Sequence, residues 1–510
     1  MNAPALTEVL RFLTALAPLR EAAVMFLLYL SGGVFLFSLG LRRLPGFLLS
    51  LAFPAGLSLF TLTGFLCLVS GLPFTGLSVS LLIFLALCAA LFFGPGKKET
   101  GAVRSLLLNK KYLLIFLALG AAAVCFSVCR LLPVTIDNDS VYYYSVYPET
   151  LVREGRFLAS FDTFLTDVGP LSAVLNCLPF FFGFDNTIGV QTLMNLSFLG
   201  AFAAFMFREL SSSGTEKKEA RLFSVLALFF LLGSMPFRFI SSWIMSNAYF
   251  MELFFICVLL GYRSFGVEDR ENTGLFAALL LFLAMCSLLR VEGSVMTVLA
   301  VASFSLVPEN SGRKLMAETL AAALTPLLFY LMLYIRLGVD PLYSFLDLKK
   351  AVLTLGLFIL LALWILTLRK RLSESERLFS FLPAALLLLL IAGNLGLALI
   401  NKERYISNLK TFYTNIRLGN GWGIFGLFFV LCVLWSLFDL VRAGFRSPDF
   451  FDFFFPALLL TIAAACWARG GLLRVGVGDS GNRVLMQTVP FVVLILVRKA
   501  GRRSRAPGDI

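Results

Sequence analysis

Long apolar runs separated by short polar gaps recur along almost the whole chain. A helix needs about 20 apolar residues to cross the hydrocarbon core of a bilayer. On this measure the pattern predicts about fifteen candidate spans, centred near residues 31, 58, 84, 122, 197, 230, 254, 281, 299, 325, 360, 389, 431, 460 and 491. We therefore expect an all-α polytopic membrane protein with about 13–15 transmembrane helices.

One polar gap is much longer than the others. Residues 134–187 contain no long apolar run, and Gly169-Pro170 marks a turn before an amphipathic stretch. We expect a large external loop whose short interfacial helices pack over the bundle. The chain then divides into N-terminal membrane helices (1–133), the loop with an acidic motif (134–187), a transmembrane bundle (188–498) and a basic cytoplasmic tail (499–510).

Composition agrees with this class. Hydrophobic residues make up 59% of the chain and charged residues 14%, with a mean hydropathy of +0.89, whereas soluble domains carry about 25% charged residues. The net charge of +13 lies mainly in short loops, so it serves as a topology signal rather than as a nucleic-acid surface. Histidine is absent, which excludes a His base, a His-ligated metal and a His pH switch.

Basic clusters orient the spans. With fifteen spans they all fall on one side, which the positive-inside rule makes cytoplasmic, and the N-terminus is then outside. These clusters are Lys97, Lys98, Arg104, Lys110 and Lys111; Lys217, Lys218 and Arg221; Arg313 and Lys314; Arg369, Lys370, Arg371 and Arg377; and Arg498, Lys499, Arg502, Arg503 and Arg505.

Two loops on the other side are also basic, contrary to the positive-inside rule. One carries Lys402, Arg404, Lys410 and Arg417, and the other carries Arg469, Arg474 and Arg483. Positive charge there works against orientation, so it suggests binding of an anionic headgroup or phosphate. The alternative is that these residues pair with acids of the large loop.

The large loop begins with an acidic motif, Asp137-Asn138-Asp139, where an apolar run meets water. Charged groups at that depth are costly and usually face a polar cavity. Tyr142 and Tyr144 follow, and such rings suit both an interface and the faces of sugars. The simpler alternative is that Asp139 or Ser140 caps a short helix.

Several short motifs resemble the GT-C superfamily, the integral-membrane glycosyltransferases that use polyprenyl-phosphate-linked sugars. The resemblance rests on the acidic motif, the Tyr-bearing segment after it, a Glu-Gly turn and the Gly-Pro-Leu stretch, together with two later segments. These are 137–139, 142–144, 153–155, 169–171, 289–293 (Leu-Arg-Val-Glu-Gly) and 478–483 (Gly-Asp-Ser-Gly-Asn-Arg). Segment 289–293 resembles a charged break in bacterial members. Two departures stand out: four spans precede the acidic motif, and Tyr142 or Tyr144 stands where the family often has His.

The resemblance implies an inverting single displacement with Asp137 or Asp139 as the base. Arg483, together with Arg404 or Lys402, would hold the donor phosphate, because a guanidinium binds phosphate bidentately. Two interpretations of Arg290 and Glu292 stay open, a buried structural pair and a contact with substrate. The remaining candidate substrate-binding residues are Tyr142, Tyr144, Asp479 and Asn482.

The resemblance also implies partners and a location. We expect a polyprenyl-phosphate sugar donor, a glycan, lipid or protein acceptor and the lipid bilayer as partners, and no nucleic acid. We expect no cofactor; two Asp with waters would hold Mg²⁺ or Mn²⁺ only loosely. The site would face outside in a bacterial inner membrane. The competing functions are a transporter or flippase for a lipid-linked or anionic substrate, and a non-catalytic scaffold of the same fold.

Overall fold

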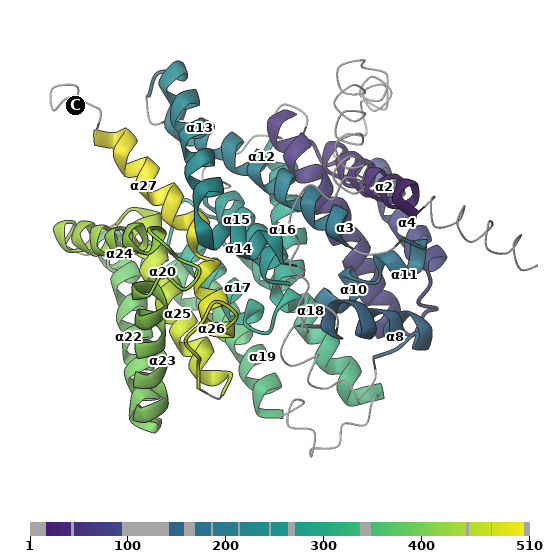
Figure 1. The fold of residues 1–510 in the computed structure, drawn as a ribbon. Coiled ribbons are helices and arrows are strands. Elements are labelled where there is room, and N and C mark those ends of the chain that lie inside the picture. The colour runs from purple at the N-terminus through teal and green to yellow at the C-terminus, as the bar shows by residue number, and fades with distance from the viewer. Residues whose placement is uncertain are drawn as a thin grey trace, which may run out of the picture.

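The computed structural model describes most of the chain in several stretches. They are residues 17–41, 45–93, 142–157, 169–184, 187–212, 215–243, 246–263, 271–336, 348–444, 448–470 and 472–503. Every regular element in these ranges is a helix, so the expected all-α class is confirmed. Figure 1 shows the helices gathered into one bundle with short helices across one end.

The first half of the chain contains the first helices of the bundle and the described short helices of the large loop. In chain order they are α2 (Ala17–Ser38), α3 (Pro45–Ser70), α4 (Gly76–Phe93), η2 (Tyr142–Val146), α8 (Tyr147–Glu154), α10 (Pro170–Leu175), α11 (Leu178–Phe182), α12 (Ile188–Ser212), α13 (Lys217–Gly233), α14 (Met235–Ser242) and α15 (Ser246–Arg263).

The second half supplies the rest of the bundle and one polar helix, α23. Its elements are α16 (Glu271–Leu289), α17 (Gly293–Ser305), α18 (Gly312–Arg336), α19 (Leu348–Leu363), η4 (Trp364–Leu368), α20 (Arg369–Ser373), α21 (Glu376–Phe379), α22 (Leu382–Ile400), α23 (Lys402–Arg417), α24 (Phe425–Arg442), α25 (Phe450–Ala468), α26 (Ser480–Met486) and α27 (Val489–Arg503).

Within the described residues, nine helices are long and apolar enough to cross a membrane. The pair α13 and α14, bent by 67° at Ser234, makes a tenth. Pro236 stands in the first turn of α14, where its missing N–H is tolerated. Four shorter apolar helices, α4, α15, α16 and α17, fall at further expected centres. Every expected centre except residue 122, which lies outside the described residues, falls in a helix.

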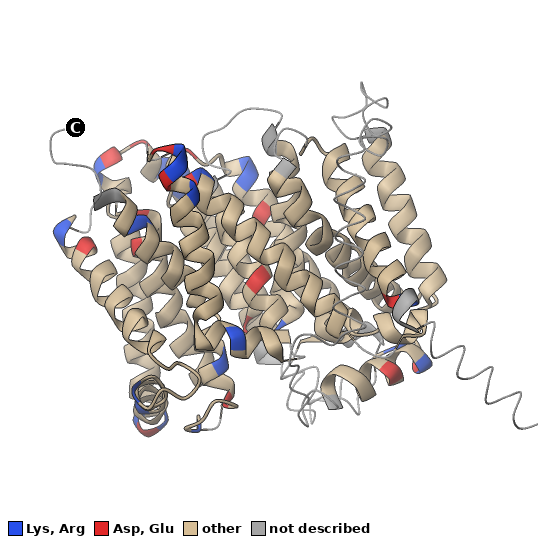
Figure 2. Cartoon of the chain, turned by 45° about the horizontal axis from the view of Figure 1, so that its top comes forward, with Lys and Arg blue, Asp and Glu red and all other residues tan. Residues whose placement is uncertain are grey.

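The bundle has two charged ends, which Figure 2 shows above and below a largely uncharged middle. We call them the Arg498 end and the Arg290 end. The Arg498 end holds the last turns of α12, α24 and α27 and the first turns of α13 and α25. The Arg290 end holds the α16–α17 junction, the first turns of α15 and α26, and α23.

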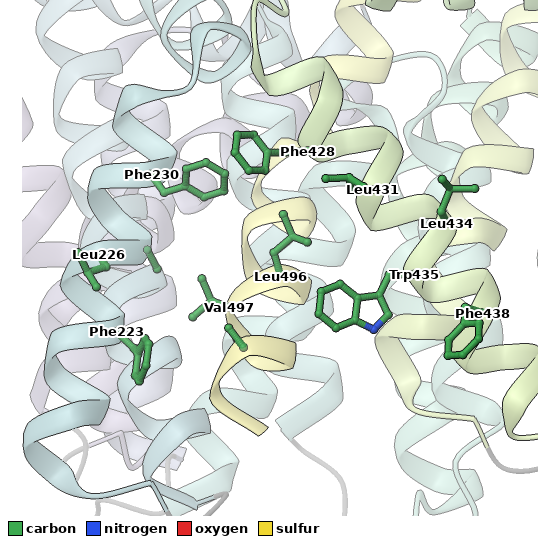
Figure 3. Close-up of a pocket in the computed structure, with 12 residues that line it drawn as sticks. Phe223, Leu226, Phe230, Phe428, Leu431, Leu434, Trp435, Phe438, Leu496 and Val497 are labelled. Carbon is green, nitrogen blue, oxygen red and sulfur yellow. The ribbon is translucent and has the colours of Figure 1, made fainter. Parts of the chain in front are cut away.

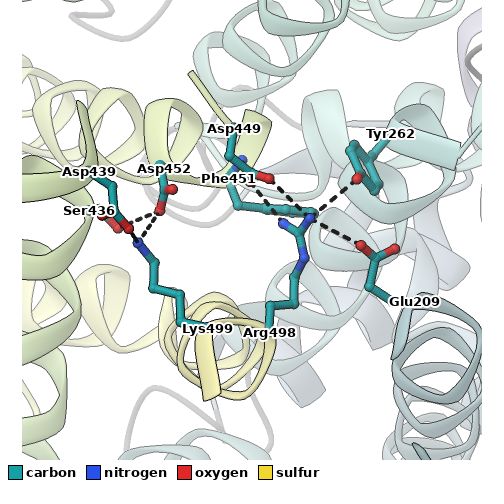
Figure 4. A network of polar contacts seen from close by, with 9 residues as sticks. All are labelled: Glu209, Tyr262, Ser436, Asp439, Asp449, Phe451, Asp452, Arg498 and Lys499. Atoms are coloured by element: carbon teal, nitrogen blue, oxygen red, sulfur yellow. Dashed lines mark hydrogen bonds and ion pairs between the residues drawn. The ribbon is translucent and has the colours of Figure 1, made fainter. Parts of the chain in front are cut away.

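Ion pairs around Arg498 tie three elements together at the first of these ends (Figure 4). Arg498 Nη1 lies 2.9 Å from Asp449 Oδ1, and its Nη2 lies 3.1 Å from Glu209 Oε1. Its guanidinium also lies over the Phe451 ring, 4.8 Å from the centroid. The pairs join α27 to α12 and to the start of α25, so α27 is held in the bundle at its C-terminal turn.

Lys499, the next residue, reaches the other side of α27. Its Nζ lies 2.6 Å from Asp452 Oδ1 and 2.5 Å from Asp439 Oδ2, and 5.4 Å from the centroid of the Trp435 ring. Lys499 is buried, and α27 continues to Arg503. The helix therefore extends past residue 498, where the sequence pattern placed the start of a basic tail.

The second half of the large loop packs on the bundle at the Arg290 end. All six residues of α10 are buried, against α3 and α16. Gly169 precedes α10 with φ +96°, and a Cβ there would stand 2.6 Å from the Leu288 carbonyl oxygen and 2.8 Å from that of Leu289. Only glycine fits both the backbone angle and this close approach, so the loop backbone rests directly on the end of α16.

Candidate functional site

The site proposed from the sequence starts at the acidic motif, and part of it lies outside the described residues. Asp137 and Asp139 are in that part. The described chain resumes at Tyr142, the first residue of η2, a single π-helical turn. The side chain of Tyr142 is likewise outside the described part. Such turns are rare and occur frequently at functional sites, so η2 draws attention to what its next residues contact.

Tyr144 of η2 meets α15 and the α16–α17 junction around one serine. Its hydroxyl lies 3.1 Å from Ser246 Oγ and accepts a hydrogen bond from the Ser246 backbone N–H at 3.1 Å. Arg290 Nη1 donates to the same Ser246 Oγ at 2.9 Å. Arg290 Nε lies 2.5 Å from Glu292 Oε1. All four residues are buried, so three separate segments converge in one polar cluster, which we call the Ser246 cluster.

Glu292 is held as a carboxylate in this cluster. Burial alone would raise the pKa of its carboxyl, whereas the guanidinium charges of Arg290 and Arg469 lower it. The hydrogen bonds from Arg290 and to the backbone act in the same direction, so the pKa of Glu292 lies below its usual value. Because the charge of Arg469 acts on the pKa of Glu292, the basic segment that follows α25 lies within electrostatic range of the Ser246 cluster.

Asp479 fixes the start of α26. Its Oδ2 accepts hydrogen bonds from the backbone N–H groups of Gly481 (2.9 Å) and Asn482 (3.1 Å). Its Oδ1 accepts one from the N–H of Arg474 at 2.8 Å. This is an N-cap with a second bond to the preceding loop. The side chain of Asp479 therefore shapes the segment that carries Arg483.

Asn482 is fully buried and uses its whole amide. Its Oδ1 accepts a hydrogen bond from Trp422 Nε1 at 2.8 Å, and its Nδ2 donates to the carbonyls of Asn420 and Gly476 at 3.0 Å each. Neutral hydrogen bonds of this kind stabilise a fold by about 1 kcal/mol each. In this arrangement Asn482 supports the position of the next residue, Arg483.

Arg483 approaches the Ser246 cluster from α26. Its guanidinium carbon lies 5.9 Å from the centroid of the Trp243 ring, a cation–π contact. Nearby, Gln487 donates to Asn247 Oδ1 at 2.9 Å. Trp243 and Asn247 stand on either side of Ser246 in the chain, so α26 is fastened to the same short segment that receives Tyr144 and Arg290.

The other two basic candidates lie on α23. Asn401 caps this helix by accepting from the Arg404 N–H at 3.0 Å. The guanidinium of Arg404 lies over the Trp467 ring, 5.5 Å from its centroid, and Lys402 is exposed. The polar face of α23 holds the 473–476 loop, through Asn408 to the Leu473 N–H and Asn415 to the Gly476 N–H. Lys402 and Arg404 are thus beside the α26 segment rather than in the Ser246 cluster.

The sequence pattern did not single out Ser246 or Trp243. The available signal was a group of four polar residues, Ser241, Ser242, Ser246 and Asn247, directly before the apolar run of α15. A lone serine has many uses, and only its three-dimensional neighbours reveal that it joins Tyr144 to Arg290.

No protein-family model, curated protein or solved structure matches the chain. The residues of this region themselves define the chemistry that it can support. The region offers buried hydroxyls, a fixed guanidinium–carboxylate pair and further cations on α23 and in segment 469–483.

Proposed function

We propose that the protein is a membrane glycosyltransferase that moves a sugar from a polyprenyl-phosphate donor to an acceptor hydroxyl. The Arg290 end faces outside in this proposal, since the other end carries those basic clusters that lie in the described residues (Figure 2), and the positive-inside rule assigns them to the cytoplasm. The site comprises the acidic motif, the Ser246 cluster and Arg483.

One observation carries the proposal. Tyr144 lies five residues after Asp139, and Arg290 lies 146 residues after Tyr144. The two residues belong to separate motifs, and both bond to Ser246. Arg483, from a third motif, lies against Trp243 in the same segment. Motifs that share one function are expected to lie close in space, and the contacts of these three with segment 243–247 support the proposal.

The residues supply a balanced displacement. Asp137 or Asp139 takes the proton of the acceptor hydroxyl, and the oxygen forms a bond to the anomeric carbon of the sugar. The bond from that carbon to the phosphate oxygen breaks, and the electron pair leaves with the polyprenyl phosphate. A phosphate leaving group needs cationic stabilisation, and in this proposal Arg483 supplies it. In this proposal the buried Arg290–Glu292 pair holds Ser246 and Tyr144 in position at the sugar-binding site.

The test is transfer by purified protein in lipid nanodiscs, supplied with a panel of polyprenyl-phosphate sugars. Release of polyprenyl phosphate is measured for the wild type, Asp137→Asn and Asp139→Asn. Loss of the base should slow transfer on the order of 10²–10⁴-fold. Glu149→Gln is the matched control, because Glu149 is an exposed acid on α8, close in sequence to the motif. Near-normal rates in both Asp variants would remove the catalytic role of the motif.

A transporter or flippase is the second candidate, and one observation favours it. Glu252 of α15 and Glu318 of α18 are both fully buried, and neither carboxylate has a hydrogen-bond partner among the described residues. Buried acids within membrane helices often belong to proton or ion pathways.

The two functions separate in a single experiment on proteoliposomes. Movement of a fluorescent polyprenyl-phosphate lipid between leaflets is followed for the wild type and Glu252→Gln, beside the transfer assay. Leaflet exchange that stops in Glu252→Gln, with no sugar transfer by the wild type, would establish the carrier. Transfer that depends on Asp137 or Asp139, with no leaflet exchange, would establish the transferase.

A further inference from the structure

A long apolar groove runs between α13 and α24, with α27 as its floor (Figure 3). Its volume is about 780 Å³, within the range of roughly 300–1,000 Å³ typical of small-molecule sites. Phe223, Leu226 and Phe230 line one wall, Leu431 and Trp435 the other, and Leu496 the floor. None of these residues belongs to the site proposed above.

The groove opens on a surface that faces hydrocarbon. Leu226 and Leu431, on its two walls, are 50% and 45% exposed, and Phe229 and Leu427 beside it are 68% and 58% exposed. Residues 428 to 438 cover about 15 Å along α24 at 1.5 Å per residue, close to half the thickness of a bilayer core. The groove therefore matches one chain from a single leaflet.

One end of the groove continues into a polar hollow of about 170 Å³ at the Arg498 end, and the two share Trp435 and Phe438. Arg442 lines the hollow and is exposed. Asp439, one turn earlier on α24, lines it too, and its side chain is 30% exposed even though it contacts Lys499. The hollow thus presents a cation and a carboxylate next to each other.

We propose that the groove and the hollow together bind one zwitterionic phospholipid of the ethanolamine type. An acyl chain fills the groove, the phosphate contacts Arg442, and the ammonium group faces Asp439. A lone anionic headgroup fits less well, because the three carboxylates that line the hollow, Asp439, Asp449 and Asp452, are matched by three cations, Arg442, Arg498 and Lys499, so the lining has no excess of positive charge. The lipid joins α13, α24 and α27, and it holds the Arg498 end together independently of any chemistry at the other end.

Native mass spectrometry of the full chain tests this. The protein is exposed to vesicles of equal parts phosphatidylethanolamine and phosphatidylglycerol, extracted in mild detergent, and weighed with its retained lipid. One phosphatidylethanolamine per chain should remain bound. Leu431→Trp fills the groove and should abolish retention. Val430→Trp is the control, because Val430 is the neighbouring position, 41% exposed, and does not line the groove.

Arg442→Gln tests the headgroup contact. Loss of one charge-assisted contact to phosphate should weaken retention about tenfold. Equal retention by the wild type and Leu431→Trp would overturn the proposal. So would a preference for phosphatidylglycerol, or a dimer that dissociates in Leu431→Trp, since a second copy would then cover the groove.

A spectroscopic readout avoids dependence on a variant that fails to fold. Phosphatidylethanolamine brominated in its acyl chains should quench the fluorescence of Trp435, which is obtained as the difference between the wild type and Trp435→Phe. Quenching should exceed that by brominated phosphatidylglycerol at the same mole fraction. Equal quenching by both lipids, or none, would contradict the proposed site.

Discussion

The two ends of the bundle use their charges differently. At the Arg498 end, Arg498 and Lys499 are matched by carboxylates from α12, α24 and α25 at 2.5–3.1 Å. At the Arg290 end, the buried pair of Arg290 and Glu292 is accompanied by many further cations. On α23 and in segment 469–483 cations outnumber carboxylates, and guanidinium groups there lie over tryptophan rings.

This difference separates a structural role from a binding role. A carboxylate neutralises the cation that it contacts, whereas an aromatic ring attracts the cation without cancelling its charge. At the Arg498 end, the charges of Arg498 and Lys499 are therefore neutralised within the protein. On α23 and in segment 469–483, cations outnumber carboxylates, and such a surface attracts anionic groups, of which the phosphate of a lipid-linked sugar is one.

The largest expected effect concerns stability at the Arg498 end. Arg498→Met leaves Asp449 and Glu209 without their guanidinium, and breaking a buried pair in this way costs about 3–5 kcal/mol. Thermal unfolding in detergent should show a large decrease in Tm. Arg377→Gln, at an exposed position on the same side, is the control and should leave Tm nearly unchanged. Equal Tm values for Arg498→Met and the control would mean that the network does not hold α27.

A smaller effect, on activity rather than stability, is expected for Arg483→Lys. Lysine keeps the charge but loses the planar pair of donors, so binding of the transferring phosphate should weaken by about 1.5–3 kcal/mol. The assay is release of polyprenyl phosphate in nanodiscs. Arg474→Lys is the control, because Arg474 is an exposed cation in the same segment. If both variants lose activity equally, the planar donor pair of Arg483 has no specific role in binding the phosphate, and the contradicted element is the bidentate contact.

The smallest effect is a pH dependence from Glu292. The pKa of Glu292 is lowered in the folded protein, so its ionised form stabilises the fold above the ordinary glutamate pKa of 4.5. This contribution is lost as the pH falls below 4.5 through the folded-state pKa. The Tm difference between the wild type and Glu292→Gln should therefore shrink from pH 7 to pH 4. A difference that stays constant over this range would show that Glu292 is not held ionised.

The helices could be predicted from sequence because a segment that crosses lipid must satisfy its backbone internally and present long apolar runs. The charged break at Arg290 and Glu292 was visible for the same reason, since it interrupts such a run. The bend between α13 and α14 was not foreseen, although Ser234 and Pro236 interrupt the apolar pattern there.

The partners of charged residues could not be predicted in the same way. Hydropathy assigns Lys499 to a solvated tail because it weighs each charge alone. Lys499 is buried because it pairs with two carboxylates. These belong to Asp439 and Asp452, which lie on two other helices about 50 residues earlier in the chain. Ser246 was missed for a related reason, since its importance comes entirely from Tyr144 and Arg290, which are distant in sequence.

The contact of Gly169 with the last carbonyls of α16 has a consequence for motion. The loop backbone at Gly169 and the guanidinium of Arg290 share one anchor, the end of α16 at Leu289. Thermal displacements of that helix end therefore shift the loop and Arg290 in the same direction. The distance between Gly169 and Arg290 should then fluctuate less than the position of either residue in the bundle. Spectroscopic distance distributions between labels on α10 and α17 should be narrower than those between α10 and α23.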